Sequence, residues 1–399
     1  MKFFITILFI LSQFLFAKSL YLSNLPLPDT QVINISTQKC SHQCLTDLLD
    51  NGQIFSFLSN YNTTYTDENL TKEYQLLKLT LNIKNYTPSG QVSIALLYPK
   101  KVIGRYAIST TNSIMAYFLN KKVNFKLEIF DCQNETLYNL KNAIKEITDK
   151  GYSFVIAPLT QTGVQKLSQI DSSLIFYIPT INRTDTPNKN ANFIFGGIDY
   201  KKQIEKLLPF TNDKIAIFSD QSPTGFKLSK YVQDSGKNIV YQKVIPQSQT
   251  KFRSILKHNR RLQDSSIFLN TPLVKSSLLA SQFRFYKIEP YALFSTQVNY
   301  NPLLLNLTQY QDRKNMYIAN SIEQSDPYLV ITDKLLDNDI RFDWINYSTS
   351  IGIDYLYTLY FNPNSNRTFN EEIIDNQVLY NVNIVKPTIS SFKEVEIYQ

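Results

Sequence analysis

A transition from strand to helix lies at residues 154–167, which read FVIAPLTQTGVQKL. Phe154 to Ala157 are apolar without alternation, as a parallel strand requires when both faces of its sheet are covered. Pro158 and the polar residues 160–163 end this strand, and helical spacing begins at Val164 and Leu167. A strand, a short polar loop and a helix in this order form the repeating unit of an α/β protein.

The same unit recurs on both sides of this stretch. A first series has strands at 92–98, 123–129 and 174–178 and helices at 104–119 and 137–147. A second series has strands at 214–218, 239–245, 267–269, 291–294 and 316–319 and helices to about 233, at 251–262 and through 278–283. A helix at 349–361 and a strand at 379–385 follow. Two successive series predict an α/β protein with two doubly wound lobes.

A shorter helical segment precedes the lobes. Helical spacing runs from Cys44 to Leu58 and from Asn69 to Leu81, and turn residues gather from Tyr86 to Gly90. We therefore expect a signal peptide, a preface and two lobes, each lobe made of two segments. The ranges are 1–19 for the signal peptide, 20–86 for an extended segment and helical preface, 90–197 plus about 325–362 for the first lobe, and 198–322 plus about 363–399 for the second.

The N-terminus is typical of an exported protein. Lys2 is followed by an almost wholly apolar run from Phe3 to Phe16, and Ala17 and Ser19 are small residues at the positions that a signal peptidase recognises. The run is shorter than the roughly 20 residues that span a bilayer. No Cys lies at its end to carry a lipid, and no later apolar run approaches membrane length. We expect a soluble periplasmic protein with its leader cleaved and no membrane span.

The charge pattern argues against a nucleic-acid partner. The formal net charge is +8 and only 19% of residues are charged. A nucleic-acid-binding protein concentrates its charge, whereas the densest basic run here, Lys257 to Arg261, reads as the polar end of one helix.

The sequence lacks most motifs of catalysis. With 10 Gly and 2 His in the chain, neither a Gly-rich phosphate loop, a Gly-x-Ser-x-Gly elbow nor a His-Glu-x-x-His pair occurs. Carboxylate pairs of the glycosidase kind remain open, because spacing alone does not identify them. We therefore expect no enzyme, no cofactor and no metal site.

The cysteines indicate a local disulfide. Cys40 and Cys44 lie one helical turn apart, about 6 Å, which is within bridging range. Free thiols and a metal site that includes His42 are the alternatives, although no further metal ligand is apparent. Cys132 ends an apolar run and is interpreted as a buried thiol.

Polar residues at strand ends are the candidate ligand-binding residues. Hydroxyls and free N–H groups before a helix could hold a carboxylate, or they could simply cap the helix. An arginine in such a loop could clamp an anion or form a surface ion pair. The six candidates are Thr160, Gln161, Thr162 and Arg183 in the first lobe and Ser222 and Thr224 in the second.

Asn69 is a candidate glycosylation site. Among several Asn-x-Ser/Thr sequences, this one alone has an acidic residue two positions earlier, Asp67, as bacterial N-glycosylation prefers. The prediction holds only if the source organism has that machinery.

Residues 90 to the end resemble the type I periplasmic binding-protein fold of the leucine/isoleucine/valine-binding family. The match is closer to the C-terminal domain of the lipoprotein activators of penicillin-binding proteins. The matching pieces are 92–98, 156–160, 164–167, 178–183, 192–196, 268–270, 285–286, 292–296 and 351–354. The chain departs from the activators in having no lipidated Cys and only a short helical preface in place of their helical-repeat domain.

The resemblance implies a non-catalytic interaction or regulatory protein of the cell envelope, with peptidoglycan synthesis as the process it would act on and a penicillin-binding protein as its partner. The alternative is a solute receptor that serves an inner-membrane ABC transporter or sensor. These two hypotheses differ in the partner, which is an envelope protein in the first and a small solute in the second.

We predict that the leader is removed and that no lipid is added. Intact-mass measurement of the exported protein checks this, because a mass without residues 1–19 and without an acyl group is expected. Retention of the apolar run would instead indicate a membrane anchor.

Overall fold

A computed structural model describes residues 32, 40–61, 67–81, 83, 92–104, 106–187, 190–363 and 365–395. The predicted signal peptide lies outside these residues. The chain divides into two compact units, Met1–Ser89 and Gly90–Gln399. Among the described helices, none combines the length and the apolar character that crossing a membrane requires.

The first unit is a small helical core. It contains α2 (His42–Asp50), α3 (Ile54–Asn60) and α4 (Glu68–Thr80). Their buried apolar residues are Leu45, Phe57, Leu58 and Leu70. The helical spacing from Cys44 to Leu58 is divided between α2 and α3, because Gly52 adopts a positive φ of 67° that ends the first helix.

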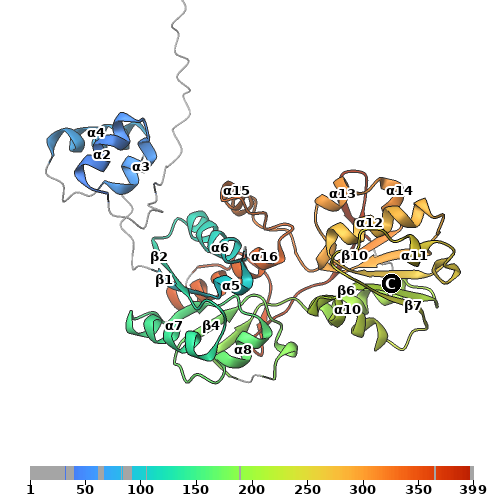
Figure 1. Ribbon diagram of the computed structural model, residues 1–399. Coiled ribbons are helices and arrows are strands. Elements are labelled where there is room, and N and C mark those ends of the chain that lie inside the picture. The colour runs from blue at the N-terminus through green and yellow to red at the C-terminus, as the bar shows by residue number, and fades with distance from the viewer. Residues whose placement is uncertain are drawn as a thin grey trace, which may run out of the picture. The chain divides into compact units, whose positions relative to one another are not determined.

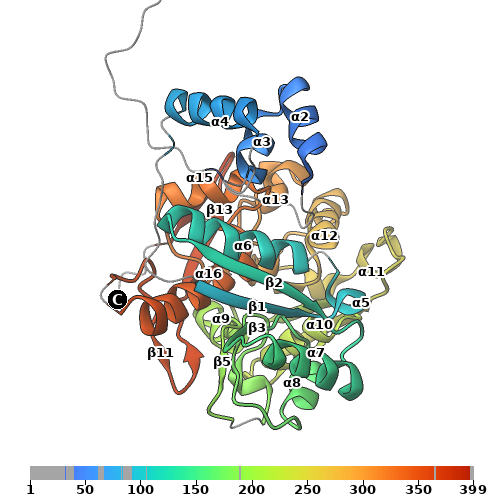
Figure 2. The same ribbon diagram turned by 90° about the vertical axis from the view of Figure 1, so that its left-hand side faces the viewer.

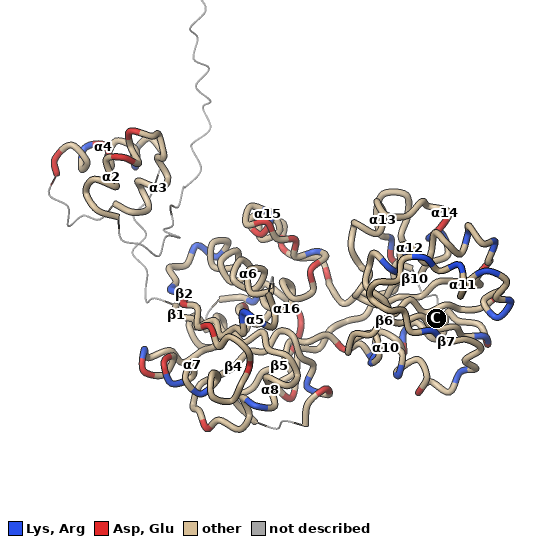
Figure 3. Tube along the Cα trace, in the orientation of Figure 1, with Lys and Arg blue, Asp and Glu red and all other residues tan. Residues whose placement is uncertain are grey.

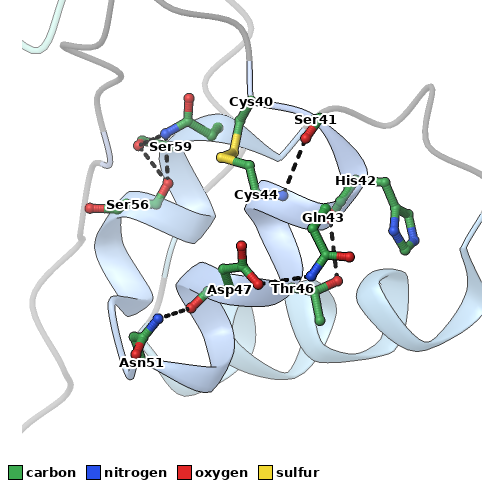
Figure 4. The surroundings of a disulfide bond; sticks show 11 residues. Cys40, Ser41, His42, Gln43, Cys44, Thr46, Asp47, Asn51, Ser56 and Ser59 are labelled. Atoms are coloured by element: carbon green, nitrogen blue, oxygen red, sulfur yellow. Dashed lines mark hydrogen bonds between the residues drawn. A yellow bond between two sulfur atoms is a disulfide. The ribbon is translucent and has the colours of Figure 1, made fainter.

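A disulfide joins Cys40 to Cys44 at the start of α2, with 5.5 Å between their Cα atoms (Figure 4). The Ser41 side chain caps the same helix by accepting a hydrogen bond from the backbone N–H of Cys44.

Asn69 is exposed in the first turn of α4, and its glycosylation stays a prediction. Cys132 is buried, which raises the pKa of its thiol to about 12.

The second unit consists of two seven-stranded sheets, each with helices on both faces (Figures 1 and 2). The first sheet has the order β11-β12-β5-β4-β3-β1-β2 and the second β14-β13-β10-β9-β8-β6-β7. The strands of the first sheet are β1 (Val92–Tyr98), β2 (Phe125–Asp131), β3 (Phe154–Ile156), β4 (Ile175–Ile178), β5 (Phe193–Phe195), β11 (Ile373–Ile374) and β12 (Gln377–Val378). Those of the second are β6 (Ile215–Asp220), β7 (Ile239–Ile245), β8 (Ser266–Asn270), β9 (Ala292–Ser295), β10 (Met316–Asn320), β13 (Asn383–Pro387) and β14 (Phe392–Glu394). The predicted α/β class with two doubly wound lobes is confirmed.

The first sheet is covered on both faces, as its continuous apolar strands require. Its helices are α5 (Lys100–Ile103), α6 (Tyr106–Lys121), α7 (Leu137–Asp149), α8 (Gln161–Leu167), α15 (Pro327–Leu335) and α16 (Trp344–Leu356). On β1, Ile94 and Leu96 pack with α6 and α16, whereas Ala95 and Leu97 pack with α7 and α8. The sheet is parallel around β1, where Leu96 pairs with Ile129 on one side and Ile156 on the other.

The second sheet follows the same rule. Its helices are α9 (Tyr200–Leu207), α10 (Pro223–Gln233), α11 (Arg253–Leu256), α12 (Leu273–Phe285), α13 (Leu303–Leu307) and α14 (Tyr310–Arg313). On β6, Ile215 and Ile217 pack with α9 and α10, and Ala216 and Phe218 pack on the face of α12. Lys, Arg, Asp and Glu are interspersed over both lobes (Figure 3).

Three crossovers join the lobes: 196–199, 321–326 and 379–382. The last lies later than expected. We assigned about 363–399 to the second lobe, but β11 and β12 lie in that range and pair with β5 of the first sheet. The reason is that Phe369 and Val378 are buried in the core of the first lobe, which retains the chain to that point.

The helix predicted at 251–262 is also shorter in the structure. Its α-helical part ends at Leu256, and His258 adopts a positive φ of 63°. A residue in this left-handed conformation breaks an α-helix. The basic run from Lys257 to Arg261 therefore follows α11 and does not form its end.

We predict that labelling of the denatured, non-reduced protein with a thiol reagent modifies only Cys132. After reduction the mature chain should take up three labels. Three labels without reduction would show that Cys40 and Cys44 are free thiols.

We predict that Gly352→Ala destabilises the second unit by about 1–3 kcal/mol through overpacking. An added Cβ would lie 2.2 Å from Cε1 of the buried Tyr177 ring. Urea unfolding measures the change in the free energy of unfolding. A decrease indicates the clash with Tyr177, and an increase contradicts it. Without the clash, Ala in place of Gly within a helix raises stability by about 1 kcal/mol.

Candidate functional site

The candidate site is a cleft between the two lobes with a volume of about 1020 Å³. It lies where loops follow the carboxyl ends of strands, which is the usual place for ligands in open α/β sheets. Leu159 and Thr180 follow β3 and β4 on the first wall, and Pro223 follows β6 on the second. Ile198, in the first crossover, also lines the cleft.

Three of the six predicted ligand-binding residues line this cleft: Thr160, Gln161 and Thr224. Thr162, Arg183 and Ser222 are not part of its lining. Arg183 points to the hairpin of β11 and β12, where its guanidinium donates to the carbonyl of Asp375. Its backbone N–H donates to the Gln377 side chain at 2.7 Å. Arg183 thus ties one strand-end loop to the sheet edge.

The hydrogen-bond donors of Thr160 are taken by a carboxylate of the protein itself. Glu135, only 4% exposed, accepts hydrogen bonds from the Thr160 N–H at 2.7 Å and from the Thr160 hydroxyl. The hydroxyl oxygen also caps α8 by accepting from the Gly163 N–H at 3.2 Å. A Cβ on Gly163 would lie 2.4 Å from Glu135 Oε1, so the glycine makes room for this carboxylate.

The second wall repeats this arrangement. The Ser222 hydroxyl donates to Asp220 Oδ1 at 2.6 Å and accepts from the Gly225 N–H at 3.0 Å, capping α10. A Cβ on Gly225 would lie 2.2 Å from the same Asp220 oxygen. The two loops share the pattern hydroxyl, any residue, Thr, Gly, at 160–163 and 222–225. This shared pattern was available in the sequence, but the carboxylate that accompanies each loop was not predicted.

An ion pair crosses the cleft. The Lys227 ammonium on α10 contacts the Asp185 carboxylate in the short helical turn Arg183–Asp185 of the first lobe. The ammonium also lies 5.8 Å and 5.9 Å from the ring centres of Tyr200 and Tyr231, within reach of a cation–π interaction. Burial, and then the negative charge of Asp185, raise the pKa of Tyr231 to about 12. No spacing rule singles out Lys227 among the chain's many lysines.

The remaining lining combines apolar and aromatic residues with two further lysines and two further acidic residues, Lys201, Glu205, Lys230 and Asp234. Tyr106 and Trp344 stand on the wall of the first lobe, opposite Tyr200 and Tyr231. Such walls bury an organic solute, and a few polar groups orient it. Within the described part of the chain, no group of three or more His, Cys, Asp or Glu is placed to hold a metal ion.

Comparison with known proteins gives similarity in structure only. No protein-family model and no curated protein sequence matches the chain. The branched-chain amino acid transporter substrate-binding protein LivJ from Streptococcus pneumoniae, solved with isoleucine, is 10% identical with a TM-score of 0.56, covering 77% of this chain and 99% of that one. An amino acid ABC transporter substrate-binding protein from Pseudomonas fluorescens is 11% identical with a TM-score of 0.57, covering 77% and 95%.

A branched-chain amino acid ABC transporter periplasmic ligand-binding protein from Burkholderia xenovorans is 10% identical with a TM-score of 0.58, again covering 77% of this chain and 95% of the other. At these identities the likeness is one of fold. The chain therefore has the type I periplasmic binding-protein fold of the leucine/isoleucine/valine-binding kind.

Proposed function

We propose that this protein is a non-catalytic periplasmic receptor for a small solute, which it binds between its two lobes. The observation that carries the proposal is the cleft of about 1020 Å³, whose lining comes from strand-end loops of both lobes. A solute held there contacts both walls at once. It therefore stabilises the arrangement in which the lobes are close, and the three crossovers supply the hinge.

The similar solved structures support this reading over a regulator of peptidoglycan synthesis. They are named as solute-binding proteins of transporters, although at about 10% identity the likeness is one of fold. Neither the fold nor the cleft supports the penicillin-binding-protein partner that we expected. The transporter or sensor that the receptor serves is part of the proposal, as is the cleavage of residues 1–19.

One surface favours protein contacts as a second role. On α15, Tyr328, Ile331 and Leu335 are large apolar side chains on the outward side, with Tyr328 74% and Leu335 81% exposed. The other side of the helix buries Leu329 in the core. Exposed apolar residues gathered in this way are typical of interaction sites. A receptor that docks on a membrane protein needs such a surface as well.

We predict that one class of small solute raises the melting temperature of the mature protein. Solute at about 100 times its dissociation constant adds about 2.7 kcal/mol of stability, which corresponds to several degrees. Thermal screening with amino acids, amines, sugars and short peptides checks this.

Trp344→Ala in the cleft should reduce the thermal shift by at least half, because it removes apolar contact area. Tyr138→Ala is the matched control, since Tyr138 is an exposed aromatic residue on α7 outside the cleft lining. A shift that survives Trp344→Ala unchanged would place the solute elsewhere, and no shift with any solute would contradict the receptor.

A further inference from the structure

The charges of the cleft carry information about the solute. Asp185 is largely buried, with 16% of its side chain exposed, and its ion-pair partner Lys227 comes from the opposite lobe. Gln161 holds the same loop in place by donating its side-chain amide to the backbone carbonyl of Asp185. The first wall therefore presents a fixed, poorly hydrated negative charge, and the Lys227 ammonium contacts it from the opposite lobe.

The surroundings of this contact suit a cation. Two tyrosine rings, Tyr200 and Tyr231, lie within 6 Å of the ammonium. Aromatic faces attract ammonium and guanidinium groups through the ring quadrupole, more strongly where water is excluded. Asp185, Tyr200 and Tyr231 thus form an acidic and aromatic cage, and the Lys227 side chain fills it.

The hydrogen-bond donors of the two strand-end loops, at Thr160 and Ser222, are already taken by carboxylates of the protein. Glu135 takes the N–H and hydroxyl of Thr160, and Asp220 takes the hydroxyl of Ser222. A carboxylate brought to either strand end would meet a carboxylate of the protein at close range and find these donors already used. Like charges at this distance repel, most strongly in a poorly hydrated cleft.

We propose that the cleft selects an organic cation without a carboxylate, such as an alkyl amine or a guanidine. Its charged group takes the place of the Lys227 ammonium beside Asp185, in front of Tyr200 and Tyr231. Lys227 acts as an internal competitor: it holds the two walls together until the solute arrives, and then extends into solvent. The inference rests on the proposed receptor function and names the chemical class of its solute.

The test is titration calorimetry of the mature protein with putrescine, agmatine and choline as cations. L-leucine and L-glutamate are the carboxylate-bearing probes, and ribose is the neutral one. We expect at least one cation to bind and the other probes to bind at least tenfold more weakly. Asp185→Asn should weaken binding of the cation at least tenfold, because the cage loses its charge.

The substitution at Lys227 gives the sharper result. Lys227→Gln should strengthen cation binding about fivefold or more, since it removes the competitor and one positive charge. Lys206→Gln removes the same charge from α9 outside the cleft lining and should change affinity less than twofold. Thermal unfolding of each variant verifies that it is folded.

The outcomes separate this inference from the receptor function. If leucine or ribose binds and no cation does, the inference is wrong and the receptor function stands. If Lys227→Gln weakens cation binding, Lys227 contributes to binding the cation, and its proposed role as an internal competitor is wrong. If no probe binds to the folded wild type or to Lys227→Gln, and wider screening also fails, both proposals fall.

Discussion

The second unit depends on a buried contact between β4 and α16. The Tyr177 hydroxyl donates to the backbone carbonyl of Ser348 at 2.7 Å, and its ring lies against α16 where Gly352 has no side chain. The Ser348 hydroxyl lies between the carbonyls of Pro179 and Gly196, 3.0 and 2.8 Å away. This contact returns a late helix to a sheet built from residues far earlier in the chain. The first lobe can therefore consist of two segments of the chain, with residues of the second lobe inserted between them.

The parts of the fold that depend on local pattern could be predicted from the sequence. Strand β1 was expected at 92–98 and has those bounds, because a strand buried on both faces is continuously apolar. The edge strand β11 and its neighbour β12 were missed because they are two residues long. A pair of residues has no periodicity to detect. The third crossover was consequently placed too early in the chain.

The candidate site was harder to predict, because its residues act through distant partners. The loops at Thr160 and Ser222 were found from their positions after strands. That Thr160 is paired with Glu135, 25 residues earlier, depends on how the loop after β2 reaches across the sheet. Asp185 and Lys227 are 42 residues apart and belong to different lobes. Composition and spacing contain no information about such pairs. The strand-end loops could therefore be predicted from the sequence, whereas the charged side chains that lie beside them could not.

Hydrogen bonds at the crossovers limit where the molecule can bend. The Gly196 carbonyl accepts from the Tyr380 hydroxyl and the Gly197 carbonyl from the Gln377 amide, so the first and third crossovers are fastened together on the side of the first lobe. The second crossover begins fastened to the second lobe, where the Ser321 hydroxyl accepts from Gln203 at 2.7 Å. The third crossover is also tied to the second lobe, because the Lys202 ammonium donates to the Tyr380 carbonyl at 2.8 Å, and to the second crossover, because the Asn381 amide donates to Glu323 at 2.7 Å. The three crossovers are thus linked to one another or to α9, so a change of torsion in one of them cannot occur without adjustment of its neighbours.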